Sequence, residues 1–78
     1  MKKKIRICVA LKSGAILRGK SVKEHCRPML ENTVEDIYKA MAKIEKSLIN
    51  GDRPMIHLNT VHCCFWFEEF AGVWVEEV

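Results

Sequence analysis

Hydrophobic and polar residues alternate near the start of the chain. From Ile5 to Leu11 every second side chain is aliphatic, which predicts a half-buried strand, because successive side chains of a strand point to opposite faces. Residues 12–15 have turn chemistry and precede a shorter apolar stretch, residues 16–20, so a β-hairpin is predicted. Residues 21–28 have no period and are predicted to be a connector, because the proline at position 28 disfavours a helical residue before it.

The middle of the chain has the period of a helix instead. Asn32 or Thr33 provides an N-terminal cap, each with an acidic residue three positions later. Asn50 followed by Gly51 provides a stop signal. Aliphatic side chains at spacings of three and four form the stripe that we expect to pack on the sheet: Val34, Ile37, Met41, Ile44 and Leu48.

Further strands are predicted after the helix. Residues 55–58 are a short strand candidate, residues 61–68 a longer one rich in aromatic and β-branched side chains, and residues 73–76 a last one beyond Gly72. The order β-β-α-β-β, with space for a fifth short strand, predicts an α+β fold: a single antiparallel sheet with one amphipathic helix packed on one face. The 78 residues are expected to form one small domain, residues 1–78.

Five of the six aromatic residues lie within ten positions near the end of the sequence. If residues 61–68 form one strand, the helix stripe can cover only one of its faces. The opposite face then carries Cys64 and Trp66 and, by the same alternation in the last strand, Trp74. Exposed apolar patches mark interaction sites, so these three residues are interface candidates. The face expected beneath the helix consists of Val61, Cys63, Phe65 and Phe67.

Two interpretations of the tryptophan face are open. In the first, a two-fold axis brings the same patch of two copies together, and the protein is a homo-oligomer. Assembly would stabilise so short a chain, because its own core is small. In the second, the tryptophans lie beneath the long aliphatic stems of Arg6 and Arg18 within one subunit.

Charge is unevenly distributed in the chain, which carries 13 Lys and Arg against 10 Asp and Glu. Nine of the basic residues precede position 28, whereas residues 54–78 contain four Glu and neither Lys nor Arg. We favour ion pairs between the two ends, across strands or between subunits. The alternative is a nucleic-acid-binding domain whose basic strands contact phosphates. Its candidate residues are Lys4, Arg6, Lys12, Arg18 and Lys20, together with Lys2, Lys3, Lys23 and Arg27.

The segment from Val9 to Lys20 bears on this alternative. In this segment the apolar Leu17 lies three positions after Gly14, and Gly19 lies two positions after Leu17. This spacing resembles the first strand pair of Sm-like RNA-binding proteins. The resemblance implies a ring-forming RNA-binding barrel. It covers about a dozen of the 78 positions. A long helix stands where that barrel would continue, so no RNA-binding residue carries over.

The cysteines and histidines do not predict a metal or catalytic site. Cys63 and Cys64 are adjacent on a predicted strand and would point to opposite faces, whereas zinc ligands are usually separated by two to four residues. The sequence also lacks a nucleophile elbow, a phosphate-binding loop and an HExxH motif. We therefore expect a protein that is not an enzyme and that holds no cofactor and no metal.

These features predict a non-catalytic protein-interaction or assembly module. Its expected partner is itself or another protein, with no membrane and no small molecule. The apolar run after the basic N-terminus is too short for a secretory signal or a membrane helix, and the four cysteines are expected to be reduced thiols, so a cytoplasmic location is expected. The small size and the lack of signatures suggest a bacterial or mobile-element genome.

Overall fold

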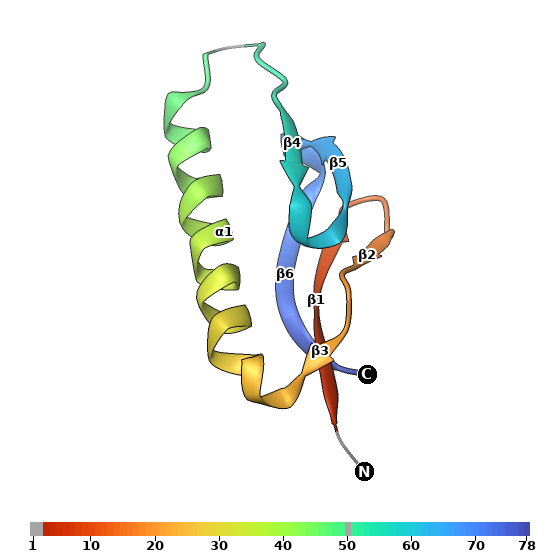
Figure 1. Ribbon diagram of the computed structural model, residues 1–78. Coiled ribbons are helices and arrows are strands. Elements are labelled where there is room, and N and C mark those ends of the chain that lie inside the picture. The colour runs from red at the N-terminus through yellow and green to blue at the C-terminus, as the bar shows by residue number, and fades with distance from the viewer. Residues whose placement is uncertain (1–2, 50) are drawn as a thin grey trace.

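The computed structural model describes residues 3–49 and 51–78. They form an α+β fold in which a four-stranded antiparallel sheet carries one helix and a two-stranded hairpin (Figure 1). The predicted fold class is confirmed, and the small second sheet is an addition to it. The elements are β1 (Lys4–Leu11), β2 (Ile16–Arg18), β3 (Val22–Lys23), α1 (Arg27–Ser47), β4 (Met55–Leu58), β5 (Cys63–Trp66) and β6 (Phe70–Glu77), with the 3₁₀ turns η1 (Glu24–Cys26), η2 (Asn59–Val61) and η3 (Phe67–Glu69).

Strand β1 is the centre of the larger sheet. One of its edges pairs with β6 from Ile5 to Leu11, and the other pairs with β2 and with β3. The alternation seen in the sequence explains which side chains are buried. Ile5, Ile7 and Val9 point to the inner face, and each is at most 2% exposed.

Helix α1 and the hairpin of β4 and β5 both cover the inner face of this sheet. Figure 1 shows the hairpin in front of β1 and β6, with α1 running beside it. All three parts contribute to one core, so the outer face of the sheet has no second layer within the described ranges. The buried core residues are Ile7, Val9 and Val73 from the sheet, Ile56, Val61 and Phe65 from the hairpin region, and Ile37 and Met41 from α1.

The prediction of one long strand over residues 61–68 is wrong. Strand β5 pairs with the four residues of β4 and no further, and η2 and η3 flank it. His62 separates η2 from β5 in the left-handed conformation, with a φ of 49°. The side-chain alternation is nevertheless kept across these turns, and the predicted inner-facing set is confirmed: Val61 and Phe65 are buried, and Cys63 and Phe67 pack against them.

The helix begins earlier than its predicted cap. It starts at Arg27, and Pro28 lies in its first turn, where a missing N–H costs no hydrogen bond. The expectation that Pro28 disfavours a helical Arg27 and leaves residues 21–28 as a connector is therefore wrong at this position, as is a cap at Asn32 or Thr33. The Thr33 hydroxyl instead donates to the carbonyl of Met29 within the helix, at 3.0 Å.

The predicted helix stripe faces the core. Ile37 and Met41 are buried, while Val34 and Ile44 are half-buried against the same cluster. The helix ends at Ser47, so Leu48 lies at its C-cap rather than inside it. Of the predicted stop signal, Asn50 lies outside the described residues, and Gly51 has a φ of 93°.

Tyr38 fastens α1 to the edge of β6. Its hydroxyl accepts a hydrogen bond from the N–H of Val73 at 3.1 Å and donates one to the carbonyl of the same residue at 3.2 Å. Strand β6 is longer than predicted, and Gly72 lies inside it opposite Ala10 instead of ending a loop. A Cβ at Gly72 would stand 3.5 Å from the Tyr38 hydroxyl, so the glycine leaves space beside this contact.

Replacing Met41 by Ala removes a buried side chain from the contact between α1 and the sheet. We expect the free energy of unfolding to fall by about 2–5 kcal/mol, as for other truncations in protein cores. Urea denaturation followed by circular dichroism measures this. Lys43→Ala changes an exposed position of the same helix and should stay within about 0.5 kcal/mol of the wild type. Equal stability of Met41→Ala and the wild type would contradict the packing described above.

Gly19 lies where the segment between β2 and β3 passes closest to η2. Its N–H donates to the carbonyl of Ile7 at 2.8 Å, and a Cβ at this position would stand 2.5 Å from the carbonyl oxygen of Thr60. Side chains essentially never approach a backbone atom this closely. The glycine that contributes to the Sm-like pattern thus allows the hairpin to pack on the sheet.

Gly19→Ala is expected to lower the free energy of unfolding by about 1–3 kcal/mol, because the added methyl group forces η2 away from β1. Gly72→Ala adds the same methyl group where there is more space and should cost less. Both variants can be compared with the wild type by urea denaturation. The close approach of Thr60 would be refuted if Gly19→Ala were the more stable of the two.

Candidate interaction surface

The outer side of the hairpin exposes large apolar side chains. Ile56 and Phe65 point into the core, so the residues that alternate with them point outward. Met55 and Trp66 are directly opposite each other in the ladder, and they are 49% and 40% exposed. The second outward pair is formed by His57 and Cys64. We call these four residues the hairpin face: Met55, His57, Cys64 and Trp66.

The two outward pairs of the hairpin are non-hydrogen-bonded pairs, the type in which side chains on neighbouring strands lie closest. The N–H of Phe67 donates to the carbonyl of Pro54 at 2.8 Å, and the alternation of an antiparallel ladder then makes Met55 and Trp66 a non-hydrogen-bonded pair. On Trp66 the guanidinium of Arg53 lies 5.1 Å from the ring centroid. A cation so placed attracts the ring and limits its rotation, while much of the indole stays accessible.

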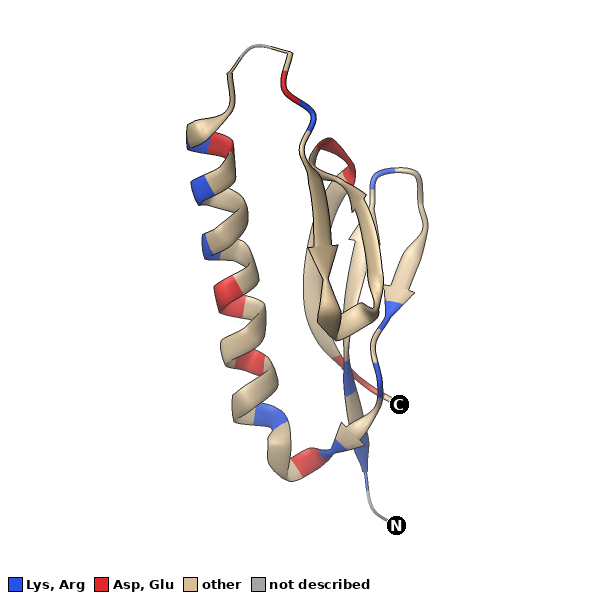
Figure 2. Ribbon diagram, turned by 45° about the horizontal axis from the view of Figure 1, so that its top comes forward, with Lys and Arg blue, Asp and Glu red and all other residues tan. Residues whose placement is uncertain are grey.

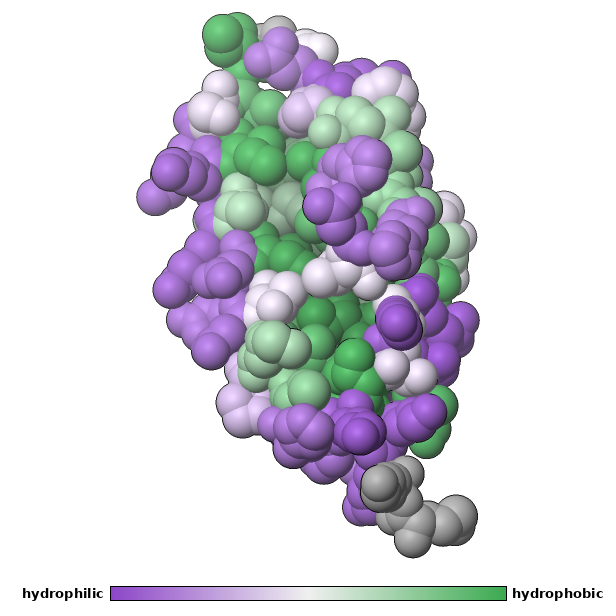
Figure 3. Space-filling model, viewed as in Figure 1, coloured by the Kyte–Doolittle hydropathy of each residue, from purple (hydrophilic) through white to green (hydrophobic). Residues whose placement is uncertain are grey.

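An apolar groove adjoins the hairpin face. It has a volume of about 350 Å³ and lies between α1 and β4. Figure 3 shows apolar atoms between the polar outer side of α1 and the hairpin. The helix contributes Ile37, Ala40 and Ile44 to this groove, and the strand contributes Met55 and Ile56.

Trp66 and Trp74 do not share a sheet face. Strand β5 pairs with β4 alone, whereas β6 pairs with β1 in the larger sheet. The prediction that both tryptophans lie on one face is therefore wrong. The structure brings Cys64 and Trp66 together on the hairpin face and places Trp74 on the outer face of the larger sheet, opposite Cys8.

The outer face of the larger sheet carries a completely buried side chain, that of Cys8. Cys8 points to that face, where no second layer covers it, and yet it is completely inaccessible. Its partners across the two neighbouring strands are Arg18 and Trp74. Burial raises the pKa of the Cys8 thiol, which keeps it protonated and unreactive. Trp74 is half-buried on this face and lies two positions from Glu76, the partner of Arg6 and Arg18. This placement is compatible with the second interpretation of the sequence, in which arginine stems cover the tryptophan.

Ion pairs join the basic start of the chain to its acidic end. Arg6 donates to Glu76 at 2.7 Å, and this hydrogen bond lowers the pKa of the Glu76 carboxyl and raises the pKa of Arg6. Arg18 lies 3.9 Å from the same carboxylate. Arg27 lies 3.7 Å from Glu77 and also donates locally to Glu24 at 2.6 Å, which lowers the pKa of the Glu24 carboxyl. The favoured interpretation of the charge distribution, ion pairs across strands, is confirmed at Glu76.

The candidate residues for nucleic-acid binding are divided by this arrangement. Arg6 and Arg18 form the pairs with Glu76. Lys4, Lys12 and Lys20 have no carboxylate within 4 Å among the described residues, and they lie at different parts of β1, its following turn and the β2–β3 segment. Figure 2 shows basic positions spread over these strands and their turns, with acidic positions at the end of β6.

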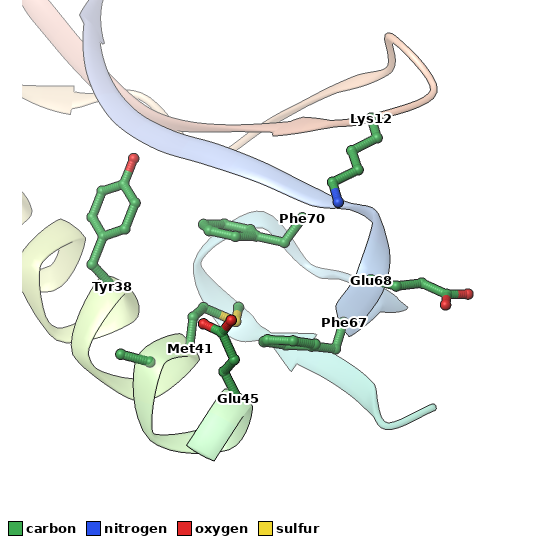
Figure 4. A pocket seen from close by; sticks show the side chains of 8 residues that line it. Lys12, Tyr38, Met41, Glu45, Phe67, Glu68 and Phe70 are labelled. Atoms are coloured by element: carbon green, nitrogen blue, oxygen red, sulfur yellow. The ribbon is translucent and has the colours of Figure 1, made fainter. Parts of the chain in front are cut away.

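A second cavity lies on the other side of α1, beside η3 and the start of β6. It has a volume of about 360 Å³ and is lined by the aromatic rings of Tyr38, Phe67 and Phe70 (Figure 4). The Tyr38 and Phe70 rings meet edge to face, with centroids 5.9 Å apart. Lys12 and Glu45 supply charge here, but the lining contains neither histidine, cysteine nor serine. The cavity therefore lacks the side chains of a nucleophile paired with a histidine base.

The cysteines and histidines remain dispersed. Cys63 points toward the core and Cys64 outward, so the predicted divergence of this pair is confirmed. Within residues 3–49 and 51–78, no three His, Cys, Asp or Glu side chains converge as metal ligands. All four cysteines are present as free thiols.

Side-chain alternation in the sequence identifies Cys64 and Trp66 as outward-facing, but not the residues that complete the surface around them. Met55 and His57 become part of the hairpin face only through the register of β4 against β5. The alternation in residues 55–58 is a signal that they point outward. The sequence contains no comparable signal for which strand lies opposite.

The chain matches no known protein family, and comparisons with curated proteins and with solved structures find no match. In the described part of the chain, no helix combines the length and apolar character needed to cross a bilayer.

The Glu76 pair predicts a specific pH dependence. Since the pKa of Glu76 in the folded protein is below its ordinary value of 4.5, the pair stabilises the fold above that value and loses this effect as the pH falls through the lowered pKa. Glu76→Gln should therefore be less stable than the wild type at pH 7, and the difference should shrink below about pH 4.5.

Thermal unfolding between pH 7 and pH 3 measures this difference. Glu31→Gln, which changes an exposed carboxylate on α1, serves as the control and should follow the wild-type profile. A constant difference between Glu76→Gln and the wild type over the whole range would show that the ion pair does not contribute.

Proposed function

We propose that this protein is a non-catalytic association module that assembles with itself through the hairpin face. The observation that carries this proposal is the cross-strand pair of Met55 and Trp66, two large apolar side chains that stay 49% and 40% exposed on a regular ladder. Neighbouring exposed apolar side chains of this size are typical of interaction sites.

The composition of the hairpin face supports this role. Tryptophan is enriched among the residues that contribute most to binding at protein interfaces. Arg53 and Glu68, which form an ion pair beside Trp66, provide the polar rim that usually surrounds such an anchor. The face itself carries no Lys, Arg, Asp or Glu, so a second copy can approach it without meeting a like charge.

A two-fold arrangement is the simplest form of this assembly. It places the same patch of each copy against the other, so Trp66 would contact its own symmetry mate or Met55 of the second copy. Trp74 takes no part in this interface, because it lies on the outer face of the larger sheet, beside the arginine ion pairs with Glu76. These pairs also reduce the positive charge available to phosphates, so association with protein is favoured over nucleic-acid binding.

Trp66→Ala tests the proposal against a matched control. The wild type should sediment as a dimer at micromolar concentration. Truncating a central aromatic anchor costs about 2 kcal/mol or more, so the variant should associate roughly 30-fold more weakly. Trp74→Ala removes the same side chain elsewhere and should leave the dimer intact, with the helical signal of both variants checked by circular dichroism.

A monomeric wild type at every concentration tested would overturn self-association. A dimer that is weakened by Trp74→Ala and not by Trp66→Ala would place the interface on the outer face of the larger sheet instead.

A further inference from the structure

Strand β4 has a free edge that faces the groove beside α1. Its other edge pairs with β5. The hydrogen bond from Phe67 to Pro54 and the register of the two strands make Ile56 and Leu58 the residues of β4 that exchange hydrogen bonds with β5. The N–H and C=O groups of Met55 and His57 therefore point away from β5. Within the described ranges, no protein group hydrogen-bonds to them. These four groups are a template for a further strand.

The outer edges of the larger sheet are protected in ways that β4 is not. At β6, the Tyr38 hydroxyl binds both backbone groups of Val73, and the strand ends in two glutamates. Strand β2 is three residues long and ends at Arg18. Short length, charge and coverage are the usual means of blocking edge pairing. Residues 55–58 of β4 include no Lys, Arg, Asp, Glu or Pro.

The groove is bounded by one strand and one helix. All four residues of β4 line one wall, residues of α1 line the other, and none comes from β5. An occupant that pairs with β4 would therefore be covered by the helix on its other side. Four strand residues span about 13 Å, which limits the paired segment to a few residues.

The lining of the groove defines the side chains of this occupant. Ile37, Ala40 and Ile44 form an apolar helix wall, which favours apolar side chains at alternate positions. Asp36 is the sole Asp, Glu, Lys or Arg among the lining residues. Its carboxylate favours a basic occupant over an acidic one.

We propose that the groove between α1 and β4 binds an extended, basic peptide segment of a partner protein by strand addition to the edge of β4. The backbone of the segment would pair with Met55 and His57, and its apolar side chains would contact the helix wall. This site adjoins the surface proposed for self-association, and Met55 and His57 border both. The peptide would use the free backbone edge of β4, whereas the dimer would use the outward side chains of the hairpin.

Two substitutions block the site in independent ways. His57→Pro removes an outward N–H that takes no part in the ladder with β5, so it blocks strand addition, whereas His57→Ala keeps that N–H. Ala40→Arg places a long cationic side chain in the groove. Ala42→Arg, its control, makes the same change on the side of α1 that lines the cavity in Figure 4.

The probe is a random library of linear dodecapeptides displayed on phage and selected on the immobilised wild-type protein. Enriched peptides should carry alternating apolar residues with Lys or Arg. Their synthetic, fluorescent forms should bind at least about tenfold more weakly to His57→Pro, the loss expected when one or two backbone hydrogen bonds fail to form. Binding to Ala40→Arg should also be at least about tenfold weaker, because the added side chain occupies the groove and repels a basic peptide. His57→Ala, Ala42→Arg and Trp66→Ala should bind them as the wild type does.

Three results would overturn this proposal. One is the absence of any enriched peptide, and another is binding that both blocking variants retain. The third is dissociation of the protein's own dimer by His57→Pro and Ala40→Arg, which would make a second copy the occupant of the groove. Loss of the dimer in Trp66→Ala with retained peptide binding would support both sites separately, and a wild-type monomer that still binds the peptides would refute self-association alone.

Discussion

The inner face of the larger sheet is wider than one helix can cover, and the rest of the fold depends on this constraint. Helix α1 lies toward β6, where Ile37 and Met41 reach the core and Tyr38 bonds to the strand edge. The remaining area, over β1 and β2, is covered by side chains from β4, η2 and β5. The hairpin must therefore lie on the sheet rather than continue it, and this is the reason for a second small sheet. Gly19 allows the close approach that this packing requires.

Features that depend on local periodicity could be predicted from the sequence. The alternation in β1 indicates its buried face, the spacing of Val34, Ile37, Met41 and Ile44 indicates the helix face, and the parity of residues 61–67 indicates which side chains point inward. Burial of an apolar side chain stabilises a fold in any topology, so these patterns persist even where the element differs. Residues 61–67 show this clearly, because their inward set is correct although they form two turns and a short strand.

Features that depend on distant contacts could not be predicted in the same way. The sheet that a strand joins depends on its pairing partner, and no local pattern distinguishes β5 from β6. Alternation alone therefore predicts Trp66 and Trp74 on one face, whereas they lie on two different sheets. The helix start illustrates a different ambiguity, because a proline such as Pro28 is compatible both with a connector and with the first helical turn. The candidate site likewise combines features set by local periodicity with features set by distant contacts. Exposure of Trp66 follows from parity, whereas its pairing with Met55 and the groove beside β4 follow from register and packing.

The separation of the two sheets also explains why the candidate surfaces lie on the hairpin. A strand that joins a larger sheet at its centre, as β1 does, has both edges paired. A two-stranded hairpin keeps two edges and one outer face, and here packing covers only the inner face. On the outer face of the larger sheet, Cys8 is inaccessible between its cross-strand neighbours Arg18 and Trp74. The hairpin has no equivalent long stems along its outer face beyond Arg53. The apolar side chains of the hairpin and the free backbone groups of β4 thus stay exposed because of the way in which the core is covered. A partner that binds there would bury apolar surface and satisfy free hydrogen-bonding groups.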